Sequence, residues 1–191
     1  DILLNGDIHQ ENADKIGISR RLVKTVTYAF LYGAGDQKIG FSYDPLLSPS
    51  AAKTKGAEIR QAYMDAIPGL EELVTAVKCK ATEFHEIRAI DGRRIPVDGA
   101  HKALNYLLQG SAACIAKRWM VLTHDALKQA NIEAYQLAFV HDELQFETTS
   151  KYIDDLKFAL LWGAAHAGEY YKLRIPIAAE ASTGSTWADT H

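Results

Sequence analysis

The stretch Arg20–Gly33, RRLVKTVTYAFLYG, carries two periodic patterns. Val23, Val26 and Phe30 recur at spacings of three and four residues, which is typical of the buried stripe of an amphipathic helix. A second set of two cations and two tyrosines recurs every four residues: Arg20, Lys24, Tyr28 and Tyr32. In a helix this second set forms a stripe that turns by only about 40° per step. A face with cations at its start and aromatic rings at its end suits a ligand that has phosphates at one end and a flat ring at the other.

The composition is that of an ordinary globular protein. The chain has 191 residues, of which 48% are hydrophobic and 24% are charged, enough for one large domain or two small ones. No run approaches the roughly 20 apolar residues of a membrane span, and the first residues lack a signal-peptide pattern. Cys79 and Cys114 have no metal-type spacing, so we expect free thiols in a reducing compartment. We therefore expect a cytoplasmic protein with no membrane contact.

Charge is distributed unevenly although the net charge is only -3. Residues 15–60 hold eight Lys or Arg against three acids, and residues 141–180 hold seven acids against four Lys or Arg. A basic region and an acidic region suit a polyphosphate beside a divalent metal ion. An ordinary dipolar protein shows the same asymmetry, so this observation alone decides nothing.

The beginning of the chain reads as the middle of a domain. Asp1–Leu4 is apolar and uncapped, which suggests a fragment that continues from an upstream segment. Asp7 is expected to cap a helix, and His9 would lie in its first turn, where backbone N–H groups favour anions. His9 could equally be an ordinary surface residue. Ser19 is expected to cap the helix described above.

The middle of the chain reads as scaffold, with one exception. Asp36–Ser50 has a loop-like composition, and two helices are expected after it, over Ser50–Ala66 and Leu70–Phe84. The exception is a hairpin over 86–97, whose turn Asp91-Gly92-Arg93-Arg94 carries two guanidinium groups. A solvated turn and a phosphate contact explain these arginines equally well.

A long helix is expected over residues 101–130. His101, Asn105 and Gln109 are four residues apart on one of its faces. Amides on an otherwise apolar helix either satisfy each other in the core or face a hydrogen-bonding ligand. The spacing does not choose between these alternatives.

Two strands are expected on either side of His141-Asp142-Glu143. They are Tyr135–Val140 and Leu144–Thr148, so the hairpin would carry two carboxylates at its tip. The three tip residues include neither Gly nor Asn, which tight hairpin turns favour. Something other than turn geometry is therefore expected to have selected them. A helix over 150–171 and a strand over 175–181 are expected to follow.

Six motifs, taken in chain order, resemble those of family A DNA polymerases, the DNA polymerase I type. They are Gly6-Asp7-Ile8-His9, Arg20-x3-Lys24-x3-Tyr28-x3-Tyr32-Gly33, Asp91-Gly92-Arg93-Arg94, Leu104-Asn105-x3-Gln109-Gly110, Val140-His141-Asp142-Glu143 and Trp187-x3-His191. Within that family, residues 2–9 and 30–36 are most similar to the replicative polymerases of short-tailed phages. The resemblance implies a helix-rich α+β fold, with the fingers subdomain over residues 1–97 and the C-terminal part of the antiparallel palm sheet over residues 98–191. A phage-encoded protein of this kind would act in the cytoplasm of its host cell.

The resemblance also implies a nucleotide site. The residues implied to contact the incoming dNTP are His9, Arg20, Lys24, Tyr28 and Tyr32. Lys24 would also be a candidate proton donor to the departing pyrophosphate. Tyr28 would lie against the sugar and Tyr32 near the templating base. A Tyr at position 28, as opposed to Phe, implies ready acceptance of dideoxynucleotides.

The resemblance implies metal and DNA contacts as well. Asp142 would ligand Mg²⁺ with the support of Glu143, in a two-metal mechanism, and both would be catalytic together with Lys24. The residues implied to contact primer–template DNA are His101, Asn105 and Gln109 in the minor groove, Arg93 and Arg94 at backbone phosphate, and His141 at the primer end. The minor groove presents acceptors on every base pair, and phosphate contacts are sensitive to salt.

One part of the family's pattern is missing. The other metal-binding aspartate of the palm lies just upstream of residue 1 in the family, as do the thumb and the exonuclease. We therefore expect the C-terminal portion of a longer or split DNA-directed DNA polymerase, whose partners are primer–template DNA, dNTPs and the missing N-terminal part. Alone it should synthesise negligible DNA. A non-catalytic module that binds DNA or a partner subunit is the alternative. A His-Asp phosphohydrolase is disfavoured because it needs further ligands on helices.

Overall fold

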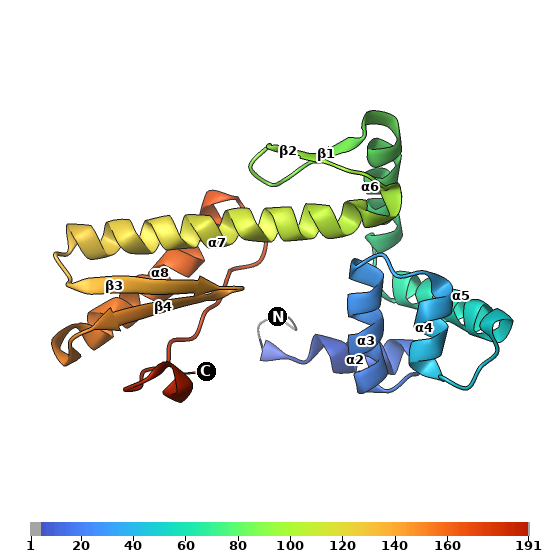
Figure 1. Ribbon diagram of the computed structural model, residues 1–191, viewed down its shortest axis with the longest axis horizontal. Coiled ribbons are helices and arrows are strands. Elements are labelled where there is room, and N and C mark those ends of the chain that lie inside the picture. Colours follow the sequence, from blue (N-terminus) through green and yellow to red (C-terminus); the bar gives the residue numbers. More distant parts are fainter. Residues whose placement is uncertain (1–4, 191) are drawn as a thin grey trace. The chain divides into compact units, whose positions relative to one another are not determined.

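The computed structural model describes residues 5–190, and the chain divides into two compact units between Gln109 and Gly110 (Figure 1). Each unit combines helices with a two-stranded antiparallel hairpin. The predicted helix-rich α+β class is therefore confirmed. The expectations for Asp1–Leu4 and His191 lie outside the described residues. The boundary between fingers and palm at residue 97 stays a prediction.

The first unit holds most of the helices. They are α2 (Ile8–Ile16), α3 (Arg20–Leu31), α4 (Asp36–Tyr43), α5 (Pro49–Ala66) and α6 (Leu70–Phe84), followed by strands β1 (Glu86–Arg88) and β2 (Arg94–Pro96), the 3-10 turn η1 (Ala100–Lys102) and the beginning of α7 (Ala103–Gln129). The second unit begins within α7. It continues with β3 (Ala134–Val140), β4 (Glu143–Thr148), η2 (Ser150–Tyr152), α8 (Ile153–Tyr170) and η3 (Trp187–Asp189).

Helix α3 forms where its sequence pattern predicts it. The Ser19 hydroxyl accepts a hydrogen bond from the backbone N–H of Leu22 at 3.3 Å, which satisfies one of the unpaired donors of the first turn. At the other end Gly33 adopts a φ of 71°, a left-handed conformation that glycine tolerates best. Helix α3 therefore has a fixed beginning and a fixed end.

The core of the first unit joins α3 to the beginning of α7. Its buried members come from α3, α4, α5, α6 and α7: Val26, Phe30, Ile39, Ile59, Tyr63, Val74 and Leu104. Leu104 lies one residue before Asn105, one of the residues expected to contact DNA. The packing of this core therefore fixes α3 and the first turn of α7 within one body.

Helix α4 corrects the loop expected over Asp36–Ser50. Pro45 and Pro49 suggested a loop, but Pro49 is the first residue of α5, a position where its missing N–H costs nothing. Gly40 on α4 and Gly56 on α5 let the two backbones touch. A Cβ on Gly40 would overlap the carbonyl of Ala52, and a Cβ on Gly56 would overlap that of Asp36. Tertiary packing, which no local pattern records, stabilises α4.

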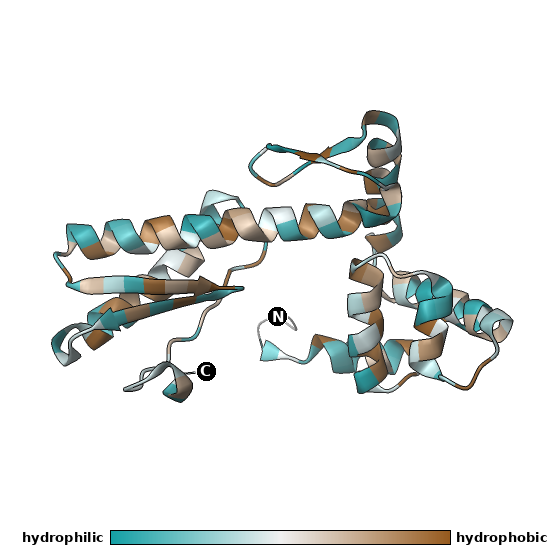
Figure 2. Ribbon diagram, in the orientation of Figure 1, coloured by the Kyte–Doolittle hydropathy of each residue, from teal (hydrophilic) through white to brown (hydrophobic). Residues whose placement is uncertain are grey.

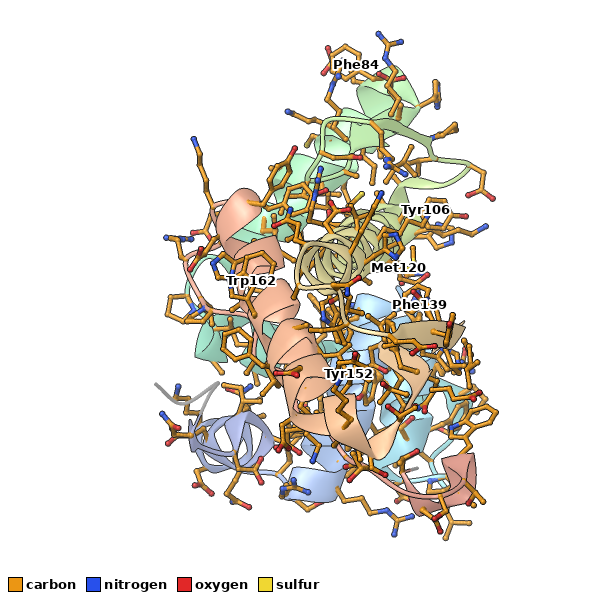
Figure 3. All side chains as sticks on the ribbon, turned by 90° about the vertical axis from the view of Figure 1, so that its left-hand side faces the viewer. Phe84, Tyr106, Met120, Phe139, Tyr152 and Trp162 are labelled. Atoms are coloured by element: carbon orange, nitrogen blue, oxygen red, sulfur yellow. The ribbon has the colours of Figure 1, made fainter. Side chains whose placement is uncertain are left out.

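The second unit packs α7 and α8 against one face of the β3–β4 hairpin. Leu127 of α7, Leu156 and Ala159 of α8 and Phe146 of β4 share its core. In Figure 3, Met120 lies on the side of α7 that faces the strand bearing Phe139, and Trp162 lies on α8. The two helices are also joined by polar contact, because the Trp119 indole donates to the Leu160 carbonyl at 2.8 Å.

The predicted strand over residues 175–181 is wrong. This segment is irregular in the structure. A strand needs a neighbour for its backbone hydrogen bonds, and among the described residues β3 and β4 pair only with each other. Alternating apolar residues therefore did not suffice to make a strand here.

Candidate functional site

The predicted stripe on α3 is exposed over its whole length. Lys24 is exposed, and the exposed fractions of Tyr28 and Tyr32 are 48% and 58%. Val23, Val26 and Phe30 on the other side of the helix are buried. Aromatic rings of this size usually lie in a core or at an interface. The stripe is therefore a surface that is available to a ligand.

Asp7 organises the beginning of this surface. Its Oδ2 atom pairs with Arg20 Nε at 2.6 Å, and its Oδ1 atom accepts the backbone N–H groups of His9 and Gln10. The hydrogen bond from Arg20, and next that from Gln10, hold the pKa of the Asp7 carboxyl below its usual 3.8. One carboxylate thus positions both the cation at the start of α3 and the first turn of α2.

His9 has an unsatisfied ring atom. Its Nδ1 is buried and has no hydrogen-bond partner among residues 5–190. Buried polar atoms are nearly always paired, so each exception calls for an explanation. Because this atom is closed to solvent, it gives no evidence for a ligand contact, and the phosphate contact expected of His9 stays a prediction.

Arg60 on α5 fixes the segment that follows α3. Its guanidinium pairs with Asp36 at 2.5 Å and donates to the carbonyl oxygen of Ala34. It also lies 5.7 Å from the centroid of the Phe30 ring. Only 23% of the Arg60 side chain is exposed. The end of α3, where Tyr32 lies, is therefore anchored from α5.

The stripe ends beside His101. A Cβ on Gly33 would overlap the carbonyl oxygen of His101, so the two backbones touch. His101 is exposed, and Asn105 and Gln109 follow it at intervals of four residues on η1 and α7. The expected nucleotide stripe and the expected DNA-contacting face thus meet at one point of the first unit.

The two arginines of the β1–β2 turn have different surroundings. Arg93 is bound to Asp91, with its Nε and Nη2 atoms both 2.6 Å from Oδ2 of that residue. Arg94 is 69% exposed, and its nearest carboxylate oxygen, on Glu86, is 3.6 Å away. Arg94 is therefore the more available of the two for an external anion.

A hollow of about 880 Å³ lies on another flank of α3. It is lined by residues such as Ile18, Arg21, Leu22 and Tyr43, and none of the four stripe residues lines it. The hollow is therefore separate from the expected nucleotide site.

The expected metal motif lies in the second unit, at the tip of the β3–β4 hairpin. Val140 pairs with Glu143, so His141 and Asp142 form a two-residue turn. His141 has a φ of 54°, which is unfavourable for a residue with a side chain. Such strain is found most often at functional sites. His85, Asn131 and Lys172 have nearly the same φ elsewhere in the chain, so the expectation that something other than turn geometry selected His141 and Asp142 stays a prediction.

The donor set at this tip fits part of a magnesium site. The Asp142 carboxylate is exposed, and Glu143 is half-buried and accepts a hydrogen bond from Gln145 Nε2 at 3.2 Å. Carboxylate oxygens and water are what Mg²⁺ prefers. Among residues 5–190, however, no three His, Cys, Asp or Glu side chains are grouped closely enough to hold a metal ion. The described residues therefore supply two candidate ligands.

The sequence missed two residues that support this site. Asp7 was expected only as a helix cap, yet it also pairs with Arg20, thirteen residues away. Arg60 had no local signal, because its partners Ala34 and Asp36 are distant in sequence. Neither contact could be read from a repeat or a motif.

No helix among the described residues is both long and apolar enough to cross a membrane. Cys79 is exposed and Cys114 is buried, and neither forms a disulfide within residues 5–190.

Known proteins resemble the chain over nearly its whole length. It is 30% identical over 216 residues to the DNA-directed DNA polymerases of Enterobacteria phage T3 and Escherichia phage T7, and 31% identical over 199 residues to that of Escherichia phage Phieco32. These matches cover 99%, 99% and 100% of this chain, and 29%, 29% and 31% of the relatives. The chain therefore spans less than a third of their length.

A solved structure and a family model agree with these relatives. The polymerase domain of Pol1 from M. smegmatis, in complex with DNA primer-template and dNTP, superposes with a TM-score of 0.83 at 25% identity. That match covers 99% of this chain and 35% of the other. The model described as DNA polymerase family A matches residues 3–189. The chain therefore belongs to DNA polymerase family A, and its relatives include the polymerases of phages T3 and T7.

Proposed function

We propose that this chain supplies the nucleotide-binding surface and part of the metal site of a template-dependent DNA polymerase, which transfers nucleotides from dNTPs to a primer 3′ end. The observation that carries the proposal is the α3 surface, where two cations and two exposed tyrosines follow one another. The cations suit the triphosphate, and the rings suit the sugar and base.

The proposed roles follow from the surroundings of each residue. Asp7 pairs with the Nε atom of Arg20, so the Nη atoms of Arg20 are proposed to bind phosphate. Lys24 has no ion-pair partner in the described part of the chain, so its ammonium is free to bind phosphate and to donate a proton to pyrophosphate. His9, in the first turn of α2, is proposed to complete the phosphate end.

DNA contacts are proposed for both units. His101, Asn105 and Gln109 line the face of η1 and α7 that begins beside Gly33. Amide groups there can donate to minor-groove acceptors, which differ little between base pairs. Arg93 and Arg94 are proposed at phosphate, and His141 at the primer end. The solved relative that holds DNA primer-template and dNTP supports this proposal.

Asp142 and Glu143 are the residues that would hold Mg²⁺. When bound, the metal ion would stabilise the negative charge that develops during phosphoryl transfer. Further ligands must come from outside the described set, because that set contains no group of three. We therefore propose that the upstream part of the polymerase completes this site, and that the isolated chain is inactive.

The test is complementation. The chain is combined with the upstream part of its polymerase, and primer extension is measured with Mg²⁺. Asp142→Ala is expected to lower the rate on the order of a thousandfold, and Lys24→Ala about a hundredfold or more. Lys53→Ala, which changes an exposed lysine on α5, is the control and should keep full activity. Full activity of Asp142→Ala and Lys24→Ala would end the proposal.

A non-catalytic DNA-binding or subunit-binding module is the remaining alternative. It is favoured only by the incomplete ligand set at Asp142. Binding of dNTP to the chain alone separates the two, because a pure DNA-binding module should ignore dNTP. Nucleotide affinity that falls in Lys24→Ala would support the polymerase.

A further inference from the structure

We propose that Arg88 and Arg94 together bind one backbone phosphate of duplex DNA on the outward face of the β1–β2 hairpin. The proposal rests on the proposed function and adds Arg88, which no motif indicated. It also gives Arg94 a role that differs from that of its neighbour Arg93.

The hairpin has one buried face and one free face. Ile87 pairs with Ile95, and Ile87 packs into a cluster with Val77 and Ala81 of α6. The labelled Phe84 in Figure 3 ends α6 immediately before this hairpin. Figure 2 shows hydrophobic residues in the middle of the pairing, flanked by hydrophilic ones. Successive side chains alternate between faces, so the residues on either side of Ile87 and Ile95 point away from α6.

Arg88 and Arg94 lie directly opposite each other on that outward face. The backbone N–H of Ala89 donates to the Arg93 carbonyl at 3.0 Å, and that of Val97 donates to the His85 carbonyl at 2.9 Å. Bonded and non-bonded pairs alternate in an antiparallel ladder, so Arg88 and Arg94 form a non-hydrogen-bonded pair. The Cβ atoms of such pairs are only about 4.5–5.5 Å apart.

Two like charges at this position destabilise the hairpin unless an anion compensates them. The compensation among the described residues is incomplete. Glu86 lies 3.6 Å from Arg94, and the Arg88 guanidinium donates one hydrogen bond, at 3.1 Å, to the neutral Gly92 carbonyl. Arg94 therefore has one carboxylate nearby, and Arg88 has no ion-pair partner among residues 5–190. A phosphate between them would accept hydrogen bonds from both and relieve the repulsion.

Arg93 has a different part in this arrangement. Its guanidinium and its backbone N–H both bind the Asp91 side chain, which lies in the same turn. Arg93 therefore holds the turn in addition to the phosphate contact proposed for it above, and the turn brings Arg88 opposite Arg94.

The test measures binding of the chain to a short primer–template duplex as a function of salt concentration. Each lost phosphate contact should reduce the slope of log affinity against log salt by about 1. Arg88→Gln and Arg94→Gln are each expected to reduce the slope by up to that amount. Because both arginines bind the same phosphate, the double variant should also reduce the slope by about 1 and not by about 2. A fourfold rise in salt should then shrink the ratio of wild-type to variant affinity about threefold to fourfold. Lys53→Gln makes the same charge change on α5 and should leave the slope unchanged.

Thermal unfolding without DNA provides the second measurement. If the two arginines repel each other, Arg88→Gln should leave the unfolding temperature at low salt unchanged or raise it. A lower unfolding temperature with an unchanged slope would mean that Arg88 acts only on Gly92, and it would overturn the proposal.

The outcomes also separate this proposal from the proposed function. An unchanged slope in Arg88→Gln, with tight binding by the wild-type chain, overturns the phosphate site alone. No DNA binding by the wild-type chain overturns the phosphate site and the DNA-binding part of the proposed function together.

Discussion

Gly33 at the end of α3 and His101 in η1 touch through their backbones, with no room for a Cβ between them. This contact joins two surfaces that come from sequence positions almost seventy residues apart. Because Gly33 also has a φ of 71°, both sterics and backbone conformation require glycine there.

Gly33→Ala should therefore destabilise the first unit by more than about 1 kcal/mol, since the new methyl group meets the His101 carbonyl in a conformation that alanine avoids. Thermal unfolding of the chain measures the effect. Gly35→Ala is the matched control, because Gly35 has a φ of -70° and open space around its Cα. Equal stability of the two variants would contradict this account of the contact.

Arg60→Met should lower the free energy of unfolding by about 1–3 kcal/mol, because it leaves the partly buried Asp36 carboxylate and the Ala34 carbonyl without their donor. The effect should be local. Amide hydrogen exchange is expected to accelerate at Gly35 and Asp36 more than at residues in α6. Lys55→Met removes an exposed ion pair on the same helix and should change little. Uniform acceleration in both variants would argue against anchoring by Arg60.

The pH dependence of the Asp7–Arg20 pair has a definite sign. The folded pKa of Asp7 is lowered, so its contribution to stability is fully present above the unfolded value of about 3.9 and is lost as the pH falls through the folded value. NMR titration of the carboxyl group should therefore give a pKa below 3.8. Replacing Arg20 with Gln should bring it back toward the usual value, because the largest cause is removed. A pKa that does not respond to this change would show that the pair does not form in solution.

Tyr28→Phe should make the completed polymerase discriminate more strongly against dideoxynucleotides, as the family resemblance implies for this position. Tyr28 is exposed on the stripe, so the change removes one hydroxyl and leaves the core intact. Chain termination by dideoxynucleotides in primer extension measures it. Tyr43→Phe, at another exposed tyrosine of the first unit, is the control. Strong discrimination by the wild-type enzyme would count against the proposed role.

The elements that the sequence predicted correctly have strong local signals. Helix α3 has a buried stripe, a serine cap and a terminal glycine, and all three are present in the structure. The β3–β4 hairpin follows from two short apolar runs around a polar tip. Periodicity and caps act over a few residues, so a sequence displays them directly.

The missed features depend on contacts between distant segments. Helix α4 is stabilised by the approach of Gly40 to α5, and residues 175–181 stay irregular because no strand within residues 5–190 pairs with them. The roles of Arg60 and Arg88 depend on the residues that lie next to them in the fold: Asp36 and Ala34 for Arg60, and Arg94 for Arg88. A single sequence records neither the partner nor the register in such cases.

The contact between α4 and α5 has one more consequence. At Gly40 and Gly56 the two helices meet with main chain against main chain, so no side chain lies between them that could change rotamer and absorb a displacement. Asp36 at the start of α4 is also bound by Arg60 from α5. A displacement of the end of α3, such as binding of the proposed nucleotide would cause, cannot be absorbed by a change of side-chain rotamer at this crossing. Helices α4 and α5 should therefore move together as one rigid body.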